Sequence, residues 1–169
     1  MSAAARYGAR WGLPLILISA LGSVVLVLTA VSVLAQGVTV MTAIAAGICA
    51  LCLLGAVPFA ISGYAVEPDA IVVFHPGWRR RFDRAALVSA EPGQEATQGS
   101  LRTFGNGGLF SFSGRYRSAS LGGYRAYVTD WADAVVLRFE HETVVISPRE
   151  PERFLAELAG SESSAKVGQ

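Results

Sequence analysis

The chain has 169 residues, of which 52% are hydrophobic, and its 14 Lys and Arg nearly balance its 13 Asp and Glu. A formal net charge of +1 gives no bulk electrostatic attraction for nucleic acid, so no nucleic-acid partner is expected. The charges are unevenly distributed, because the run from Leu13 to Gly63 contains no Asp, Glu, Lys, Arg or His. This contrast predicts an integral membrane protein with a polar domain after its anchor.

The uncharged run is long enough for two membrane-spanning helices, since one crossing takes roughly 20 mostly apolar residues. We predict spans over residues 13–35 and 40–61, joined by Gln36-Gly37-Val38-Thr39. In this short turn, Gly37 can end the first helix in a left-handed conformation and the Thr39 hydroxyl can cap the second.

Arginines flank both spans, whereas the connecting turn has no charge. Positively charged residues beside a span are retained on the cytoplasmic side. Residues 1–12, the polar domain and both termini are therefore predicted to lie in the cytoplasm, with the hairpin in the inner membrane. The alternative is a signal peptide cleaved after Ala35, but its apolar core would far exceed the roughly 7 to 15 residues that such signals use. The flanking arginines are Arg6, Arg10, Arg79, Arg80, Arg81 and Arg84.

From Gly63 onward, short runs of β-branched and aromatic residues alternate with Gly, Pro and Asp, a pattern that indicates strands and turns. Residues 78–82 and 86–90 can form two strands or one bent strand. About seven strands are expected in the folded domain. A loop is expected over residues 91–100. The predicted strand segments are 63–66, 70–75, 78–82, 86–90, 101–104, 109–116, 123–128, 134–140 and 143–146.

One helix is expected after the last strand. Ser147 can cap it, Pro148 suits its first position, and Glu150 completes a capping box. An apolar stripe at helical spacing must pack on the sheet, and it consists of Phe154, Leu155 and Leu158. Gly160 is expected to end the helix, and residues 160–169 to form a disordered tail.

Together these elements predict a membrane-anchored α+β chain, in which a two-helix transmembrane hairpin precedes a β-barrel that one C-terminal helix covers. Tyr64-Ala65-Val66 leads into Ile71-Val72-Val73-Phe74, and Gly-rich segments follow at residues 105–108 and 114–129. Residues 146–154 read Ile-Ser-Pro-Arg-Glu-Pro-Glu-Arg-Phe. With these motifs, residues 62–159 resemble the bacterial pleckstrin-homology-like (PH-like) domains.

The resemblance implies a fold and a topology more than a reaction. Similar domains often follow one or two membrane spans directly, and they serve as binding or self-association modules. Eukaryotic relatives bind phosphoinositides with a Lys and paired Arg in the first hairpin loop. The corresponding loop here is Glu67-Pro68-Asp69, and its acidity argues against recognition of that type.

Two surfaces are candidates for binding. The first is the basic run Arg79, Arg80, Arg81 and Arg84, which lies close enough to a membrane exit to contact anionic headgroups. The same arginines could serve only to set the topology. The second surrounds Gly105-Asn106-Gly107-Gly108, whose backbone N–H groups could converge on an anion or simply form a tight turn. This candidate ligand or partner surface comprises Arg102, Gly105, Gly107, Gly108, Arg115 and Arg117.

The sequence indicates no catalytic residues, cofactor or metal. Its two histidines are isolated, and no serine has a nucleophile-elbow context. Cys49 and Cys52 lie in the second span, where packing as small apolar side chains is favoured over redox chemistry.

We therefore expect a non-enzymatic inner-membrane protein that presents a cytoplasmic PH-like domain to a protein partner or to copies of itself. The alternative is sensing of anionic lipid or of a small anion through the arginine-rich segment.

Overall fold

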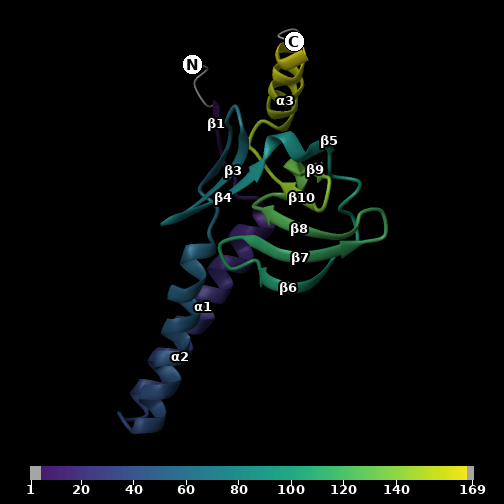
Figure 1. Cartoon of the computed structure of the whole chain (residues 1–169). Helices are drawn as coiled ribbons and strands as arrows, with labels where there is room; N and C mark the ends of the chain where they lie inside the picture. Colours follow the sequence, from purple (N-terminus) through teal and green to yellow (C-terminus); the bar gives the residue numbers. More distant parts are fainter. Residues whose placement is uncertain (1–4, 167–169) are drawn as a thin grey trace.

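Two apolar helices project together from one end of a β-rich domain (Figure 1). The computed structural model describes the backbone of residues 5–166 and the side chains of residues 5–160. Helix α1 spans Leu13–Ala35 and helix α2 spans Val40–Ala56. The predicted turn between them is confirmed: Gly37 has a φ of 108°, and the Thr39 hydroxyl accepts a hydrogen bond from the Thr42 N–H at 3.2 Å.

Both helices are long and apolar enough to cross a membrane, judged by length and composition. In the most apolar 18-residue stretch of α1, only 6% is buried inside the structure. In the corresponding stretch of the second apolar segment, none is buried. A core helix of a soluble protein would instead be mostly buried. The second apolar segment ends at Phe59, after the 3₁₀ turn Val57–Phe59, and not at Ile61 as predicted. The reason is that Ile61 packs in the core of the β-domain and is 2% exposed.

A strand that the sequence pattern did not indicate precedes the helices. Strand β1 (Ala5–Gly8) pairs antiparallel with β2 (Gly63–Val66), placing Tyr7 opposite Tyr64. The chain then forms a bridge to Pro148, and the Gly12 N–H donates to the Thr129 carbonyl at 3.0 Å. The helical hairpin is therefore inserted between two neighbouring strands of one sheet.

The strands form two sheets. The first has the order β1-β2-β3-β4, and the second has the order β5-β9-β10-β8-β7-β6. All pairs are antiparallel except β10 with β8. Strands β3 to β10 span Ala70–His75, Trp78–Asp83, Leu87–Pro92, Leu101–Gly107, Phe112–Ser118, Gly122–Val128, Val135–Phe139 and Thr143–Ile146.

The expected barrel of about seven strands is corrected in two respects. Nine strands follow the helices, and the two sheets do not close on each other. One extra strand arises because the Asp83 carboxylate accepts from the Ala85 N–H at 2.9 Å and stabilises a 3₁₀ turn (Arg84–Ala86). This turn divides β4 from β5, which join different sheets. Strand β4 remains an edge, and its exposed arginines are typical of an edge that stays solvated.

A hydrophobic core lies between the sheets and continues under helix α3 (Pro151–Lys166). The predicted stripe is confirmed, because Phe154 and Leu158 are buried and Leu155 is partly buried. The helix continues past Gly160, since that residue lacks the positive φ of a helix-ending glycine. Residues 167–169 of the expected tail lie outside the described residues.

Ser147 does not cap this helix, which begins three residues later than expected. Its hydroxyl is fully buried and accepts from the Thr129 N–H at 2.8 Å. The Tyr64 hydroxyl lies 3.2 Å from the same oxygen, and burial raises the pKa of Tyr64 to about 12. Ser147 thus joins β2, the end of β8 and the end of β10, which explains why the capping motif was misread.

The pairing of β1 can be tested at Tyr7, whose ring packs on Phe154 and whose hydroxyl donates to the Glu157 carboxylate. Tyr7→Ala should lower the free energy of unfolding by about 3 to 5 kcal/mol, because it removes a buried aromatic ring. Tyr7→Phe, the matched control, should cost about 1 kcal/mol. Urea denaturation of the full chain in neutral detergent measures both, and equal losses would contradict a structural role for the ring.

Candidate functional site

The turn between β3 and β4 is fixed to the end of the second apolar segment. The Trp78 indole N–H donates to the Pro58 carbonyl at 2.7 Å, and its ring lies edge-on to Phe59. The Trp78 ring also stacks on His75, with ring centroids 3.9 Å apart and planes 3° from parallel. This hairpin therefore keeps a fixed position relative to α2.

The loop between β6 and β7 is fixed to α1 in a similar way. The Ser19 hydroxyl donates to the Gly108 carbonyl at 2.8 Å and accepts from the Phe110 N–H at 2.9 Å. Leu15, one helical turn earlier, is fully buried in a second hydrophobic cluster, which also contains Phe112 and Val128. One face of the first turns of α1, with Leu15 and Ser19, thus packs on the domain, while most other side chains of the helix are exposed.

A cavity of about 390 Å³ lies between these two hairpins, at the end of α2. Both sheets contribute to its wall, which is mostly apolar and aromatic. Its lining comprises Phe59, His75, Trp78, Phe104, Gly105, Asn106, Ser113, Gly114 and Tyr127.

His75 contributes a polar group to this wall. Its Nδ1 lies 3.0 Å from the Ala60 carbonyl, which can only accept, so Nδ1 carries the proton and donates. Burial lowers the pKa of His75 below its ordinary value. Within the described part of the chain, Nε2 is one of two buried side-chain N or O atoms without a hydrogen-bond partner.

The structure divides the predicted basic run into two pairs. Arg81 is held by Glu67 at 2.7 Å and by Asp69 at 3.1 Å, both in the acidic turn between β2 and β3. Arg84 donates to the Leu158 carbonyl at 2.9 Å. Arg79 and Arg80 are exposed at the start of β4, beside Trp78. Of these four arginines, only Arg79 and Arg80 lie at the end of the domain where the helices emerge.

The predicted glycine turn is mostly strand. Gly105 faces Gly114 in the β6–β7 ladder, and both have positive φ angles where an added Cβ would collide with the opposite backbone. Gly107 covers the Arg102 guanidinium, which donates to the Gly105 carbonyl at 3.2 Å. The Gly108 N–H donates to the Ser111 backbone carbonyl at 3.0 Å. These glycines therefore permit close strand approach, and the reversal of the chain lies at residues 108–111, not at Asn106-Gly107.

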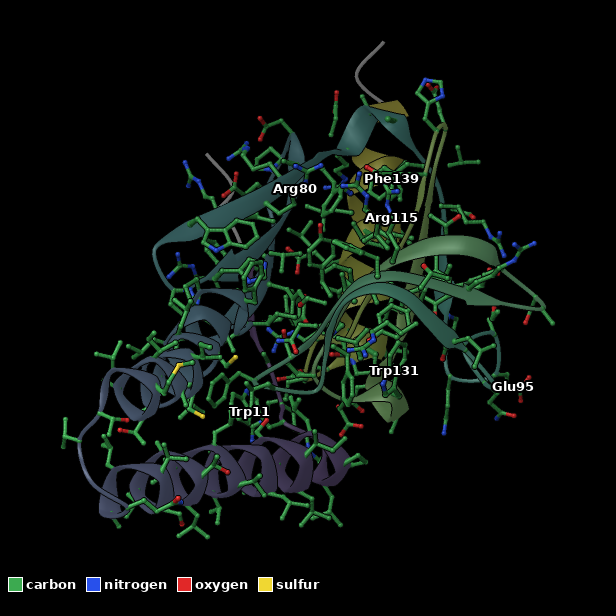
Figure 2. All side chains as sticks on the ribbon, turned by 90° about the horizontal axis from the view of Figure 1, so that it is seen from below. Trp11, Arg80, Glu95, Arg115, Trp131 and Phe139 are labelled. Carbon is green, nitrogen blue, oxygen red and sulfur yellow. The ribbon has the colours of Figure 1, made fainter. Side chains whose placement is uncertain are left out.

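The remaining predicted residues lie on one face of the second sheet. Arg115 is opposite Phe104, and Arg117 is opposite Leu101. All four side chains are exposed, and among the described residues neither arginine forms an ion pair. The nearby Arg125, by contrast, pairs with Glu142 at 3.2 Å. Figure 2 labels Arg115, which belongs to this second sheet, and Arg80, which belongs to β4 in the first sheet.

The cysteines are free thiols in α2, Cys49 half-buried and Cys52 exposed. Over the described residues, no group of three or more His, Cys, Asp and Glu is placed to hold a metal ion.

Comparison with known proteins supports the fold. The family model described as "Bacterial PH domain" matches residues 63–161, which is more than half of the chain. The chain belongs to the bacterial PH domain family. Searches of curated proteins and of solved structures found no significant match. The bacterial PH domain begins at β2 in this match, so β1 lies outside the matched region although it completes the first sheet.

Sequence reasoning about this bacterial PH domain missed the cavity and its histidine. His75 ends one predicted strand, 70–75, and Trp78 begins the next, 78–82, and the sequence indicates only a Pro76-Gly77 turn between them. The one available signal was that two aromatic side chains stand at the ends of a tight turn, close to the predicted end of the second apolar span. Nothing in the sequence indicated that Phe104 and Tyr127 would complete the wall from the other sheet.

The environment of His75 predicts a pH dependence. Because folding lowers its pKa, the unfolded chain binds a proton more readily than the folded chain once the pH falls below about 6.5, the ordinary value. The free energy of unfolding should therefore decrease as the pH drops from 7 toward 5, and this decrease should be smaller in His75→Phe. Urea denaturation across this range measures it.

His141→Phe is the control, because it removes an exposed imidazole and leaves His75 intact. It should keep the wild-type loss of stability on acidification. An unchanged pH dependence in His75→Phe would contradict this account of the buried imidazole.

Proposed function

We propose that the two apolar helices anchor this chain in the bacterial cytoplasmic membrane, and that its PH domain is a non-enzymatic interaction module on the cytoplasmic side. The exposed apolar surface of both helices supports the anchor, and the arginines beside their ends support the orientation. Both termini then lie in the cytoplasm. His75 is buried and stacked on Trp78, and its hydrogen bond goes to a backbone carbonyl, so it lacks the partners of a catalytic base.

The best-supported target of the module is the anionic surface of the same membrane. One observation carries this proposal: Arg79 and Arg80 are exposed immediately after Trp78, which is hydrogen-bonded to the end of the apolar segment. In Figure 1, the β3–β4 turn and strand β6 form the side of the domain from which the helices extend. An indole at this level is typical of the membrane interface, and adjacent arginines can reach phosphate groups.

The energy required is small, because the anchor already holds the domain at the bilayer. Each arginine close to an anionic surface contributes about 1 kcal/mol. Two such residues therefore suffice to enrich anionic lipid around the anchor by roughly thirtyfold at most. Attraction of this size sets the lipid neighbourhood of the protein without fixing any single lipid.

This proposal predicts that Arg79→Glu/Arg80→Glu abolishes the preference for anionic lipid. The full chain is reconstituted in nanodiscs that contain brominated phosphatidylglycerol or brominated phosphatidylcholine, and quenching of tryptophan fluorescence is compared. Wild type should be quenched more by the anionic lipid, and the double variant equally by both. Arg115→Glu/Arg117→Glu changes the charge by the same amount on another face and should behave as wild type. Loss of preference in both double variants would contradict a local effect.

A second candidate function is binding of a protein partner or of another copy of the chain. Strand β6 is the edge of the second sheet, so it has one side free for a further strand. Leu101 and Phe104 are 73% and 77% exposed along it, opposite the unpaired Arg117 and Arg115. An extended segment with acidic side chains would gain ladder hydrogen bonds and ion pairs on this surface.

In-cell crosslinking tests the second candidate. A photoreactive residue in place of Arg117 should capture a protein, identified by mass spectrometry, and a Leu101→Lys substitution in the same chain should reduce the yield severalfold. A photoreactive residue at Gln98, outside the strand, is the control position. Capture of lipid alone at Arg117 would reject protein binding at β6.

A further inference from the structure

The cavity between the β3–β4 and β6–β7 hairpins combines two features that no role above uses. Its wall is aromatic and apolar, and its volume of about 390 Å³ falls in the range of small-molecule sites, about 300 to 1,000 Å³. His75 is 94% buried, and its Nε2 has no partner among the described residues. A buried acceptor without a donor costs free energy, so a ligand that supplies the donor would recover it.

The hydrogen-bonding state of His75 defines the missing group. Nδ1–H is committed to the Ala60 carbonyl, which leaves a lone pair on Nε2 in the neutral ring. Two other polar side chains in the wall have partners, since Asn106 bonds with Leu109 and Ser113 lies 2.8 Å from the Ser111 hydroxyl. The Tyr127 hydroxyl, also in the wall, forms no hydrogen bond among the described residues, and it can donate to the oxygen of a bound molecule. A hydroxyl fits the Nε2 lone pair. An ether offers no proton, and a carboxylate would place negative charge against it.

The position of the cavity indicates where its ligand comes from. Phe59, the last residue of the second apolar segment, forms part of the wall, together with Trp78. Phe104 lines the cavity from β6 while remaining 77% exposed. The opening therefore lies at the level where α2 would leave the bilayer, so a membrane-dissolved molecule reaches it without crossing water.

We propose that this cavity binds one aliphatic chain of a membrane-derived amphiphile whose hydroxyl donates a hydrogen bond to Nε2 of His75. The apolar wall takes the chain, and the histidine selects the uncharged alcohol over an ether or a carboxylate. Long-chain alcohols and acylglycerols have this chemistry. The inference rests on the membrane placement proposed above, but not on the attraction of Arg79 and Arg80 for anionic lipid.

The test uses the full chain in nanodiscs of phosphatidylcholine alone, so that the arginine effect plays no part. The probes are a long-chain alcohol with a mid-chain diazirine and its methyl ether. After illumination, mass spectrometry locates and quantifies the adducts. The alcohol should reach a given level of labelling at about one tenth of the concentration that the ether requires. The reason is that the ether leaves the buried acceptor unpaired.

Three variants locate the effect. His75→Phe should give the alcohol and the ether equal labelling, since it keeps an aromatic ring and removes the acceptor. Phe104→Ala should reduce labelling by the alcohol severalfold. Leu101→Ala, which truncates an equally exposed side chain on the same strand outside the cavity, should leave it unchanged.

Equal labelling of wild type by the two probes would overturn the proposal, and so would adducts spread along α1 and α2 without enrichment in the cavity. The comparison of probes on wild type decides the matter even if His75→Phe fails to fold. Arg79→Glu/Arg80→Glu should retain the alcohol preference, which keeps this result separate from the lipid-charge proposal.

Discussion

The pairing of β1 with β2 is the constraint on which the rest of this structure depends. Because the two strands are neighbours in one sheet, they hold the start of α1 and the end of the second apolar segment side by side. The hairpin thus has both ends fixed in the domain, whereas a simple tether would have one. Further contacts strengthen this junction, including the bridge of Ala9 to Pro148 and the burial of Leu15.

A consequence is that the domain has a defined orientation relative to the two apolar helices. Ser19 binds the β6–β7 loop, and Trp78 binds the end of the apolar segment through Pro58. These contacts place the edge strand β6, the exposed arginines of β4 and the cavity on the same side of the domain as the helices. Helix α3 covers the opposite end (Figure 1). With the helices in a membrane, as proposed above, any interaction of the helix-proximal side is with the bilayer or with a partner that approaches close to it.

Local signals predicted many elements correctly. The helical hairpin, its capped turn, strands β2, β3 and β10, and the apolar stripe on α3 follow from periodicity, β-branched residues and turn chemistry. The errors share one cause. Ser147 fits a capping motif, but its hydroxyl is used by Thr129 and Tyr64, which are remote in sequence. Likewise, Gly105 fits a tight turn or an anion loop in the sequence, whereas in the structure its close approach to Gly114 on the opposite strand leaves no room for a side chain.

By itself, the sequence determined the division into an apolar helical segment and a β-rich domain, and the resemblance to bacterial PH domains. Hydrophobic length, charge distribution and turn residues are local properties, and each can be read from a short segment. Only the tertiary structure decided that β1 completes the first sheet, that Arg81 and Arg84 are engaged while Arg79 and Arg80 are exposed, and that His75 faces a cavity. These features depend on strand register and on contacts between residues far apart in the chain, and short-range patterns carry no record of either.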